Sequence, residues 1–245
     1  MKITKYPKTL ALLVIVVAAI AYSYSWTYTP HGRLDYRAAT SLHLLSFETT
    51  IKPDPKLDFE LTLPVNLIYA LSGMLPKDEV AKVQEVSIPG DGVQIPARVY
   101  WPKGTAADTK PPVLVYYHGG GFVVGSVDIF DALTRSLAET TGAIVVSVDY
   151  RLAPGSPYPA AVNDCYAAVQ WAAAHAEELG GDSAKLIVAG DSAGGNLAAV
   201  VALKAKNEHG PAIAAQILYY TVADLSGKPY ASAKKFMDGY GLSSQ

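Results

Sequence analysis

This sequence of 245 residues contains few cysteines and histidines, and its net charge is small. Cys165 is the only cysteine, so no disulfide can form within the chain. The five histidines show neither the HExxH spacing nor a CxxC partner, which gives a metal site little support. The formal net charge of −2 provides no basic field to attract nucleic acid. A disulfide scaffold and a nucleic-acid-binding protein are therefore excluded, whereas 50% hydrophobic residues suffice for a large buried core.

The first 26 residues have a composition of their own. Three lysines within the first eight residues precede an uncharged apolar run from Leu10 to Tyr22. This layout is typical of a secretory signal, and the Ala-Ile-Ala sequence that ends at residue 21 fits a cleavage site. An uncleaved membrane anchor formed by residues 9–26 is the alternative, because its aromatic residues would lie at the interface. Both interpretations predict export to the periplasm or medium, or anchoring with the rest of the chain facing outward.

The pattern of apolar residues in the rest of the chain changes near residue 83. Residues 27–82 mix prolines with short apolar clusters and are interpreted as an N-terminal helical arm or cap. Residues 83–245 contain strand-like runs separated by helix candidates, which predicts an α/β core with crossover connections. Continuous apolar runs in this part predict parallel strands buried on both faces. The expected strands are 83–88, 93–100, 112–117, 143–148, 185–189 and 214–221, and the expected helices are 128–140, 160–179 and 193–207.

The strongest local motif is Gly190-Asp191-Ser192-Ala193-Gly194, a G-x-S-x-G sequence between an expected strand and an expected helix. In this context the serine occupies a sharp, strained turn, which small neighbouring residues tolerate. Its hydroxyl then projects near the N-terminus of the following helix, where N–H groups and the helix dipole favour a developing anion. The motif predicts that Ser192 is a catalytic nucleophile; a glycine-rich turn or a phosphate-binding loop is the alternative.

A second glycine motif, the HGGGF sequence at residues 118–122, directly follows the expected strand 112–117. Consecutive glycines leave backbone N–H groups unobstructed, as an oxyanion hole requires, and HGGG-type loops have this role in lipases and esterases. Gly120, Gly121 and Ala193 are therefore predicted to donate their N–H groups to the oxyanion. A flexible turn is the alternative, but it does not explain why two such motifs occur in the required order.

Together the motifs resemble those of the hormone-sensitive lipase-like family of α/β-hydrolases, the microbial esterases with an HGGGF loop and a GDSAGG elbow. The intervening segment from Asp149 to Asp164 is similar to the family's, except that Gly155 stands where the family usually has Glu. The resemblance implies an α/β-hydrolase fold, a mostly parallel sheet with helices on both faces. It also implies hydrolysis of small carboxylic esters, with short to medium acyl chains and without a cofactor. Asp149, Arg151 and Asp164 would hydrogen-bond the loops around the elbow.

The rest of a catalytic triad is not recognisable after Ser192. In this fold the Asp or Glu and then the His follow the serine, and in the resembled family they lie beyond the position of Gln245. His209 is the only histidine after Ser192, and it is expected at the far end of the sheet. Asp224 follows the last expected strand but has no histidine to orient. The chain is therefore expected to be truncated after the sixth core strand and, expressed alone, to be poorly soluble and weakly active.

The sequence thus predicts an exported or anchored serine carboxylesterase that attacks the ester with Ser192 and passes through an acyl-enzyme. Two alternatives stay open. One is a non-catalytic exported protein that keeps the fold for binding, and a downstream Asp and His in the reading frame would argue against it. The other is an amidase or peptidase with the same elbow, which only substrate assays separate from an esterase.

Overall fold

The chain divides into two units, residues 1–57 together with 227–245, and residues 58–226. Most of the expected N-terminal arm, residues 27–82, lies outside the described residues. The computed structural model describes residues 7–29, 32–33, 35–36, 73, 75–104, 109–226 and 230–231, with the side chains of 7–13, 29 and 32 left out.

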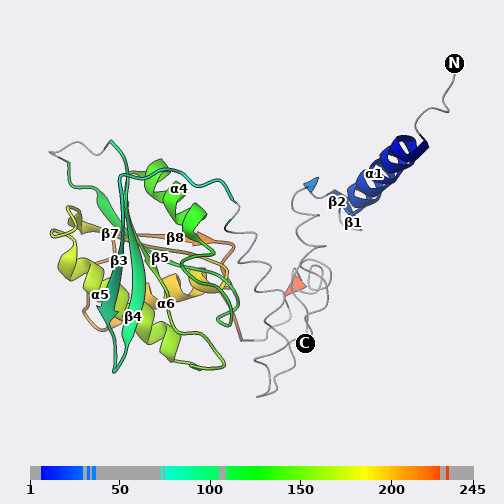
Figure 1. Cartoon of the computed structure of the whole chain (residues 1–245). Helices are drawn as coiled ribbons and strands as arrows, with labels where there is room; N and C mark the ends of the chain where they lie inside the picture. The colour runs from blue at the N-terminus through cyan, green and yellow to red at the C-terminus, as the bar shows by residue number, and fades with distance from the viewer. Residues whose placement is uncertain are drawn as a thin grey trace. The chain divides into compact units, whose positions relative to one another are not determined.

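A six-stranded sheet forms the centre of the second unit (Figure 1). The strand order is β3-β4-β6-β5-β7-β8. β3 and β4 form an antiparallel hairpin and β4 is antiparallel to β6, whereas the other neighbours are parallel. This is the mostly parallel sheet that the sequence predicts. The strands are β3 (Lys82–Pro89), β4 (Gln94–Trp101), β5 (Pro112–Tyr117), β6 (Ile144–Val148), β7 (Asp182–Asp191) and β8 (Ala215–Tyr219).

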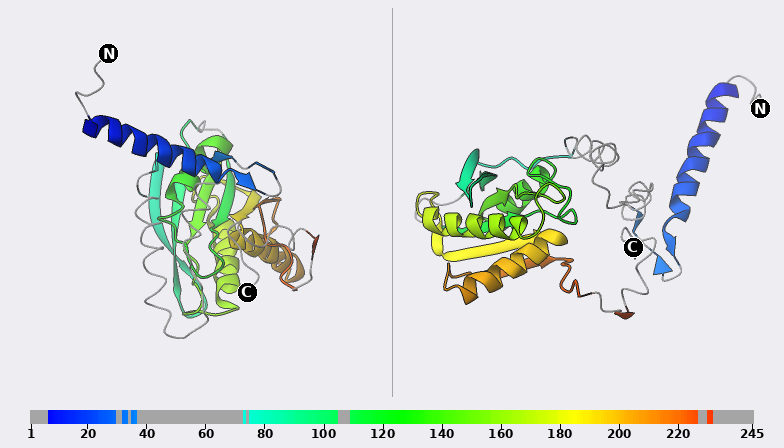
Figure 2. Two further views of the ribbon diagram at one scale, coloured as in Figure 1. Left: turned by 90° about the vertical axis from the view of Figure 1, so that its right-hand side faces the viewer. Right: turned by 90° about the horizontal axis from the view of Figure 1, so that it is seen from below.

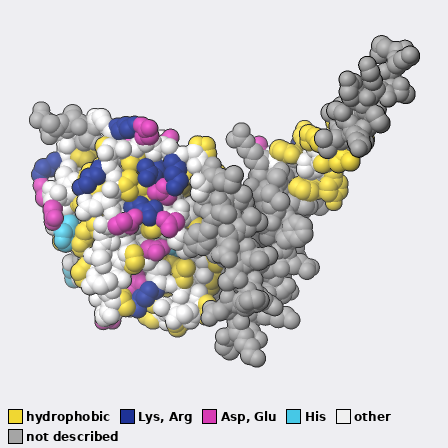
Figure 3. Space-filling model, in the orientation of Figure 1, with side chains coloured by type: hydrophobic (Ala, Val, Ile, Leu, Met, Phe, Trp, Pro, Cys, Tyr) yellow, Lys and Arg dark blue, Asp and Glu magenta, His cyan; other side chains and the backbone are white. Residues whose placement is uncertain are grey.

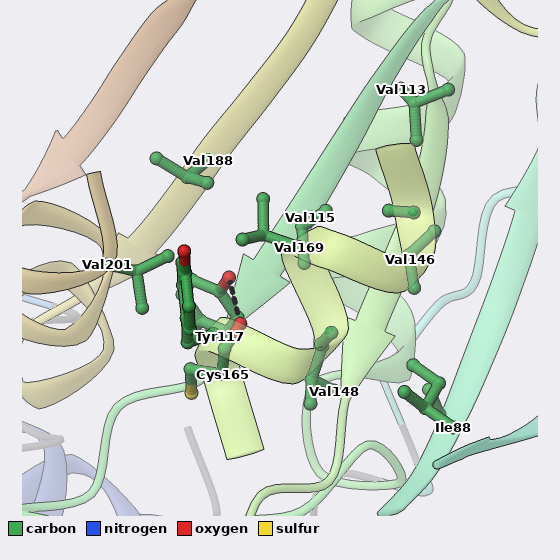
Figure 4. Packing of buried hydrophobic residues seen from close by; sticks show 14 of the residues in the cluster. Ile88, Val113, Val115, Tyr117, Val146, Val148, Cys165, Val169, Val188 and Val201 are labelled. Atoms are coloured by element: carbon green, nitrogen blue, oxygen red, sulfur yellow. Dashed lines mark hydrogen bonds between the residues drawn. The ribbon is translucent and has the colours of Figure 1, made fainter. Parts of the chain in front are cut away.

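Helices cover both faces of this sheet, as Figures 1 and 2 show. The helices are α4 (Asp131–Thr141), α5 (Ala160–His175) and α6 (Ala193–Asn207). Successive side chains of a strand point to opposite faces, so β5 contributes to two separate cores. Tyr116 belongs to the core on the α4 side, and Tyr117 belongs to the core beneath α5 and α6. Figure 4 shows the latter core, in which Val169 of α5 and Val201 of α6 accompany Tyr117.

Two helices are shorter than their sequence patterns predict. α5 ends at His175 rather than at residue 179, because the chain turns there and the Gly181 N–H donates to Ala176 O at 2.7 Å. α4 begins at Asp131 rather than at residue 128, after a turn in which the Phe130 N–H donates to a carbonyl four residues earlier. In both cases the apolar periodicity continues into a turn, so hydrophobic spacing alone does not mark the helix end.

Asp131 lies at the centre of a charged cluster that connects the β3–β4 hairpin to α4. Its side chain is only 4% exposed and contacts Lys77 Nζ at 2.8 Å, Arg135 Nε at 3.0 Å and Arg98 Nη1 at 3.3 Å. The Tyr100 hydroxyl donates to Oδ1 at 2.8 Å. Burial opposes ionisation of Asp131, but its hydrogen-bond donors outweigh burial and lower its pKa to about 2. Basic and acidic side chains are interspersed on the face that Figure 3 shows.

We expect Asp131→Asn to lower the free energy of unfolding by about 2 kcal/mol near neutral pH. The folded-state pKa lies below the unfolded value of about 4, so ionised Asp131 stabilises the fold above pH ~4. This stabilisation is lost as the pH falls toward ~2, and the difference between the two proteins should shrink over that window. Urea denaturation at a series of pH values measures it. A difference that stays constant down to the folded-state pKa would contradict the assignment.

The first unit contains α1 (Pro7–Ser25) and a hairpin of β1 (Tyr28–Thr29) and β2 (Gly32–Arg33). Every side chain of α1 from residue 14 to residue 22 is exposed. The Arg33 guanidinium lies 4.8 Å from the ring centroid of Tyr24 and 5.3 Å from that of Tyr28. In the described part of the chain, no helix combines the length and the apolar character that crossing a membrane requires.

Candidate active site

Ser192 occupies the turn between β7 and α6. Its φ of 52° and ψ of −116° place a non-glycine residue in a strained conformation. Two backbone hydrogen bonds hold this turn: the Ser192 N–H donates to Tyr219 O at 2.9 Å, and the Asn196 N–H donates to Ser192 O at 3.1 Å. The serine predicted to be the nucleophile therefore lies at the N-terminus of a 15-residue helix, where a developing negative charge is favoured.

The glycines of the G-x-S-x-G motif are required by the close approach of β5 to this turn. A Cβ atom on Gly190 would lie 2.6 Å from Tyr117 O, and one on Gly194 would lie 2.0 Å from the same oxygen. A Cβ atom on Gly195 would lie 2.1 Å from Thr221 Oγ1. The backbone carbonyl of Tyr117 cannot move without disturbing the sheet, so only glycine fits at the first two positions.

The HGGGF loop leaves β5 in a conformation that also requires glycine. Gly120 has a φ of 123° and Gly121 a φ of 62°, and a Cβ atom on Gly120 would lie 2.0 Å from Val124 O. The N–H groups of Val123 and Val124 both donate to Gly120 O and close the turn. Within the described residues, no acceptor is hydrogen-bonded to the N–H of Gly120 or Gly121. These two donors are therefore available to a bound ligand.

His118 organises the start of this loop. Its ring is fully buried and stacks between Tyr150 and Phe130, with centroid distances of 4.3 and 5.5 Å. Nδ1 lies 2.8 Å from Gly119 O, and because a carbonyl only accepts, Nδ1 carries the proton. Burial lowers the pKa of His118, which favours a neutral ring. A buried, stacked imidazole that donates to its own loop serves as a support for the loop rather than as a proton shuttle.

The segment between the two motifs braces the loops around the elbow. Arg151 and Asp164 form a bidentate pair, with Nη2 donating to Oδ1 at 2.7 Å and Nε donating to Oδ2 at 2.9 Å. The Tyr150 hydroxyl donates to His118 O at 2.6 Å. Asp149 Oδ1 accepts from the Val127 N–H at 3.2 Å, and burial raises the pKa of Asp149. These contacts agree with the bracing role that the resemblance implied for the two acidic residues and for Arg151.

Sequence reasoning gave no role to Asp191, although the residue stands inside the G-x-S-x-G motif. The structure buries its side chain, which accepts hydrogen bonds from the Gly119 N–H and from the hydroxyls of Tyr116 and Tyr220. The sequence did contain one indication that Asp191 accepts a buried hydrogen bond. A tyrosine inside an otherwise apolar buried strand, such as Tyr116 in residues 112–117, needs a partner for its hydroxyl, and a carboxylate at the end of a neighbouring strand can supply it.

A cavity of about 480 Å³ adjoins the glycine loop and the first turns of α6. Gly121 of the HGGGF loop and Asn196 of α6 both line it. Its wall is mostly apolar, and its volume lies within the range of small-molecule sites, roughly 300–1,000 Å³. The residues that line it are Gly121, Phe122, Ala153, Ser156, Tyr158, Pro159, Ala161, Val162, Asn196, Leu197, Val200 and Leu225.

The described histidines do not complete a triad. Neither His118 nor His175 nor His209 is hydrogen-bonded to Ser192. His175 stacks on Trp171 at the end of α5, and His209 follows the C-terminal end of α6, the opposite end of that helix from Ser192. Among the described residues, no group of three or more His, Cys, Asp or Glu side chains is arranged to hold a metal ion.

The chain is similar to known esterases in sequence and structure. Carboxylesterase NlhH of Mycobacterium tuberculosis is 49% identical over 148 residues, which are 59% of this chain and 46% of that protein. A hyperthermophilic esterase from Pyrobaculum calidifontis superposes with a TM-score of 0.66 at 42% identity, over 74% of this chain and 57% of that one. An ester-hydrolase from the metagenome of Lake Arreo, solved with a bipyridine phosphonate derivative, gives a TM-score of 0.70 at 34% identity, over 97% of this chain and 66% of that one.

The chain spans about half the length of the curated relatives it matches. A family described by its alpha/beta hydrolase fold matches residues 114–245, more than half of the chain. The match includes both glycine motifs, and the sheet order and elbow geometry agree with it. This chain is therefore a member of the α/β-hydrolase fold family and, within it, of the hormone-sensitive lipase-like family.

Proposed function

We propose that the protein containing this chain hydrolyses carboxylic esters with Ser192 as its nucleophile. The observation that carries the proposal is the strained Ser192 turn at the N-terminus of α6, beside a glycine loop with two N–H groups available to a ligand. The esterase names of the similar proteins support the same reaction. No metal or organic cofactor takes part in this mechanism.

In the proposed reaction, Ser192 Oγ attacks the carbonyl carbon of the ester and the carbonyl oxygen becomes an oxyanion. The N–H groups of Gly120, Gly121 and Ala193 donate to this oxyanion, each contributing about 3–4 kcal/mol to stabilisation of the transition state. The alcohol leaves, and water then hydrolyses the acyl-enzyme. Because no described histidine is hydrogen-bonded to Ser192, we place the general base in a part of the protein outside the described residues.

The cavity beside Gly121 is proposed to hold the acyl chain of the ester. The function is tested with the protein expressed from its complete gene, using nitrophenyl esters of increasing acyl length and the matching anilides. We expect ester hydrolysis, with kcat/KM rising by up to about four-fold for each methylene group that the cavity buries. Turnover of the anilides alone would favour an amidase, and saturable binding without turnover of either series would favour a binding protein.

Ala161→Phe is expected to fill part of this cavity. In this variant kcat/KM for the longer esters should fall about ten-fold or more, because only the longer acyl chains need the space. Most of the activity on the acetate should remain. Ala174→Phe, at an exposed position on the same helix, is the matched control. An equal loss for all chain lengths would show that the cavity does not hold the acyl group.

We also propose that the protein is exported or anchored through residues 9–26. The support is the lysine-rich N-terminus, the apolar run, and the exposure of every α1 side chain from residue 14 to residue 22. A reporter fused after residue 35 should be active only outside the cytoplasm. A mature N-terminus at Tyr22 would indicate cleavage and an intact Met1 an anchor, whereas cytoplasmic reporter activity would exclude both.

A further inference from the structure

Asp191 makes direct contact with three separate segments. It is the last residue of β7, immediately before Ser192, and it is only 5% exposed. Its Oδ1 accepts from the Tyr116 hydroxyl at 2.5 Å and from the Gly119 N–H at 2.8 Å. Its Oδ2 lies 3.3 Å from the Tyr220 hydroxyl, just after β8. One carboxylate thus joins the nucleophile turn to the first glycine of the HGGGF loop.

The contact with the loop is close enough to determine the residue type at position 119. A Cβ atom on Gly119 would lie 2.2 Å from Asp191 Oδ2 and 3.0 Å from the carbonyl oxygen of the same residue. Any side chain at position 119 would therefore push the loop away from the elbow. The close approach of Asp191 therefore requires glycine at position 119. Gly120, whose N–H is available to a ligand, follows directly in the chain.

The surroundings of the Tyr116 hydroxyl keep it protonated, so that it donates a hydrogen bond to the Asp191 carboxylate. Tyr116 is fully buried in β5, and burial, together with the nearby Asp191, raises its pKa well above the ordinary tyrosine value. The phenol keeps its proton at neutral pH and donates the shorter of the two hydrogen bonds to Oδ1. Tyr116 therefore holds the carboxylate in the orientation in which it can also accept from the Gly119 N–H.

We propose that Asp191 is a positioning residue, which sets the distance between Ser192 and the N–H groups of Gly120 and Gly121. The inference rests on the proposed function, because those N–H groups act on an oxyanion. Oxyanion donors must lie about 2.7–3.1 Å from the position that the oxyanion will occupy, and that tolerance is narrow. Without the carboxylate, the loop and the nucleophile remain present, but their spacing is no longer held.

The test compares Asp191→Ala with Asp191→Asn in the full-length protein. Alanine removes every acceptor, so we expect kcat to fall on the order of 10²-fold with little change in KM, since these donors act mainly in the transition state. Asparagine keeps an oxygen at Oδ1 for Tyr116 and Gly119, and its amide can donate to the Tyr220 oxygen. Asp191→Asn should therefore stay within about five-fold of the wild-type kcat.

Two adjacent tyrosines supply a matched control. Tyr116→Phe removes the hydroxyl that orients Asp191, whereas Tyr117→Phe removes a hydroxyl that donates to Cys165 O at 2.8 Å in the other core. Both side chains are fully buried, so both variants should be less stable. Only Tyr116→Phe should lower kcat, by about three- to ten-fold. Equal effects on kcat would show that the loss follows stability alone.

Amide hydrogen exchange in residues 118–122 gives a readout that does not depend on ester hydrolysis. We expect exchange there to accelerate in Asp191→Ala and to remain near the wild-type rate in Asp191→Asn. If this pattern appears in a protein without esterase activity, the positioning role stands and the proposed function fails. Unchanged exchange in Asp191→Ala, or an Asn variant as impaired as the Ala variant, would overturn the inference.

Discussion

Replacing Ser192 with alanine is expected to reduce ester hydrolysis by a factor on the order of 10⁴ or more. In the proposed mechanism the substitution removes the atom that forms the acyl-enzyme, while the HGGGF loop and the cavity remain. Substrate binding should therefore survive, and the loss should appear in kcat rather than in KM. Steady-state kinetics on the protein from the complete gene measure both constants.

A fluorophosphonate probe gives an independent measurement of the same nucleophile. We expect the probe to label Ser192 in the wild type and to label nothing in Ser192→Ala. Ser183→Ala, at an exposed position near the opposite end of β7, is the matched control and should keep full activity and labelling. Undiminished turnover or labelling in Ser192→Ala would show that another residue attacks the ester.

Gly194→Ala is expected to have the largest effect on stability, a decrease of about 3 kcal/mol or more in the free energy of unfolding. Its Cβ atom would lie 2.0 Å from Tyr117 O and 2.5 Å from His118 O, and both are backbone atoms. Relieving the clash requires α6 to move away from β5, which separates the Ser192 turn from the HGGGF loop. Ester hydrolysis should therefore be lost together with stability.

Gly180→Ala is the control for the backbone effect of removing a glycine. Gly180 has a φ of 85°, but a Cβ atom there would meet nothing within 4 Å. The free energy of unfolding of the variant should fall only by the cost of placing alanine in a left-handed conformation, about 1–2 kcal/mol. The variant should keep its activity. Urea denaturation and ester assays compare the two variants. If both variants lost the same stability and activity, the contact of Gly194 with β5 would not be the cause of the loss in Gly194→Ala.

The sequence located the strands and the two glycine motifs, because both are encoded by neighbouring residues. Residues 112–117 form β5 with the expected bounds, and residues 143–148 contain β6, which begins one residue later. Burial on both faces leaves a continuous apolar run, which can be recognised without knowing the fold. The helix ends were less well predicted, because the apolar spacing of α5 continues to Leu179 although the chain after His175 forms turns.

The sequence by itself therefore determined the fold class and the family, and it predicted Ser192 as the nucleophile. Only the tertiary structure decided how the two motifs are held together. The parallel register of β5 and β7 pairs Tyr117 with Gly190, and this brings Tyr116 against Asp191 although 75 positions separate them in the chain. The cavity likewise collects residues from the glycine loop, α5, α6 and the segment after β8. Contacts of this kind depend on sheet order and crossover connections, which no local pattern of residues specifies.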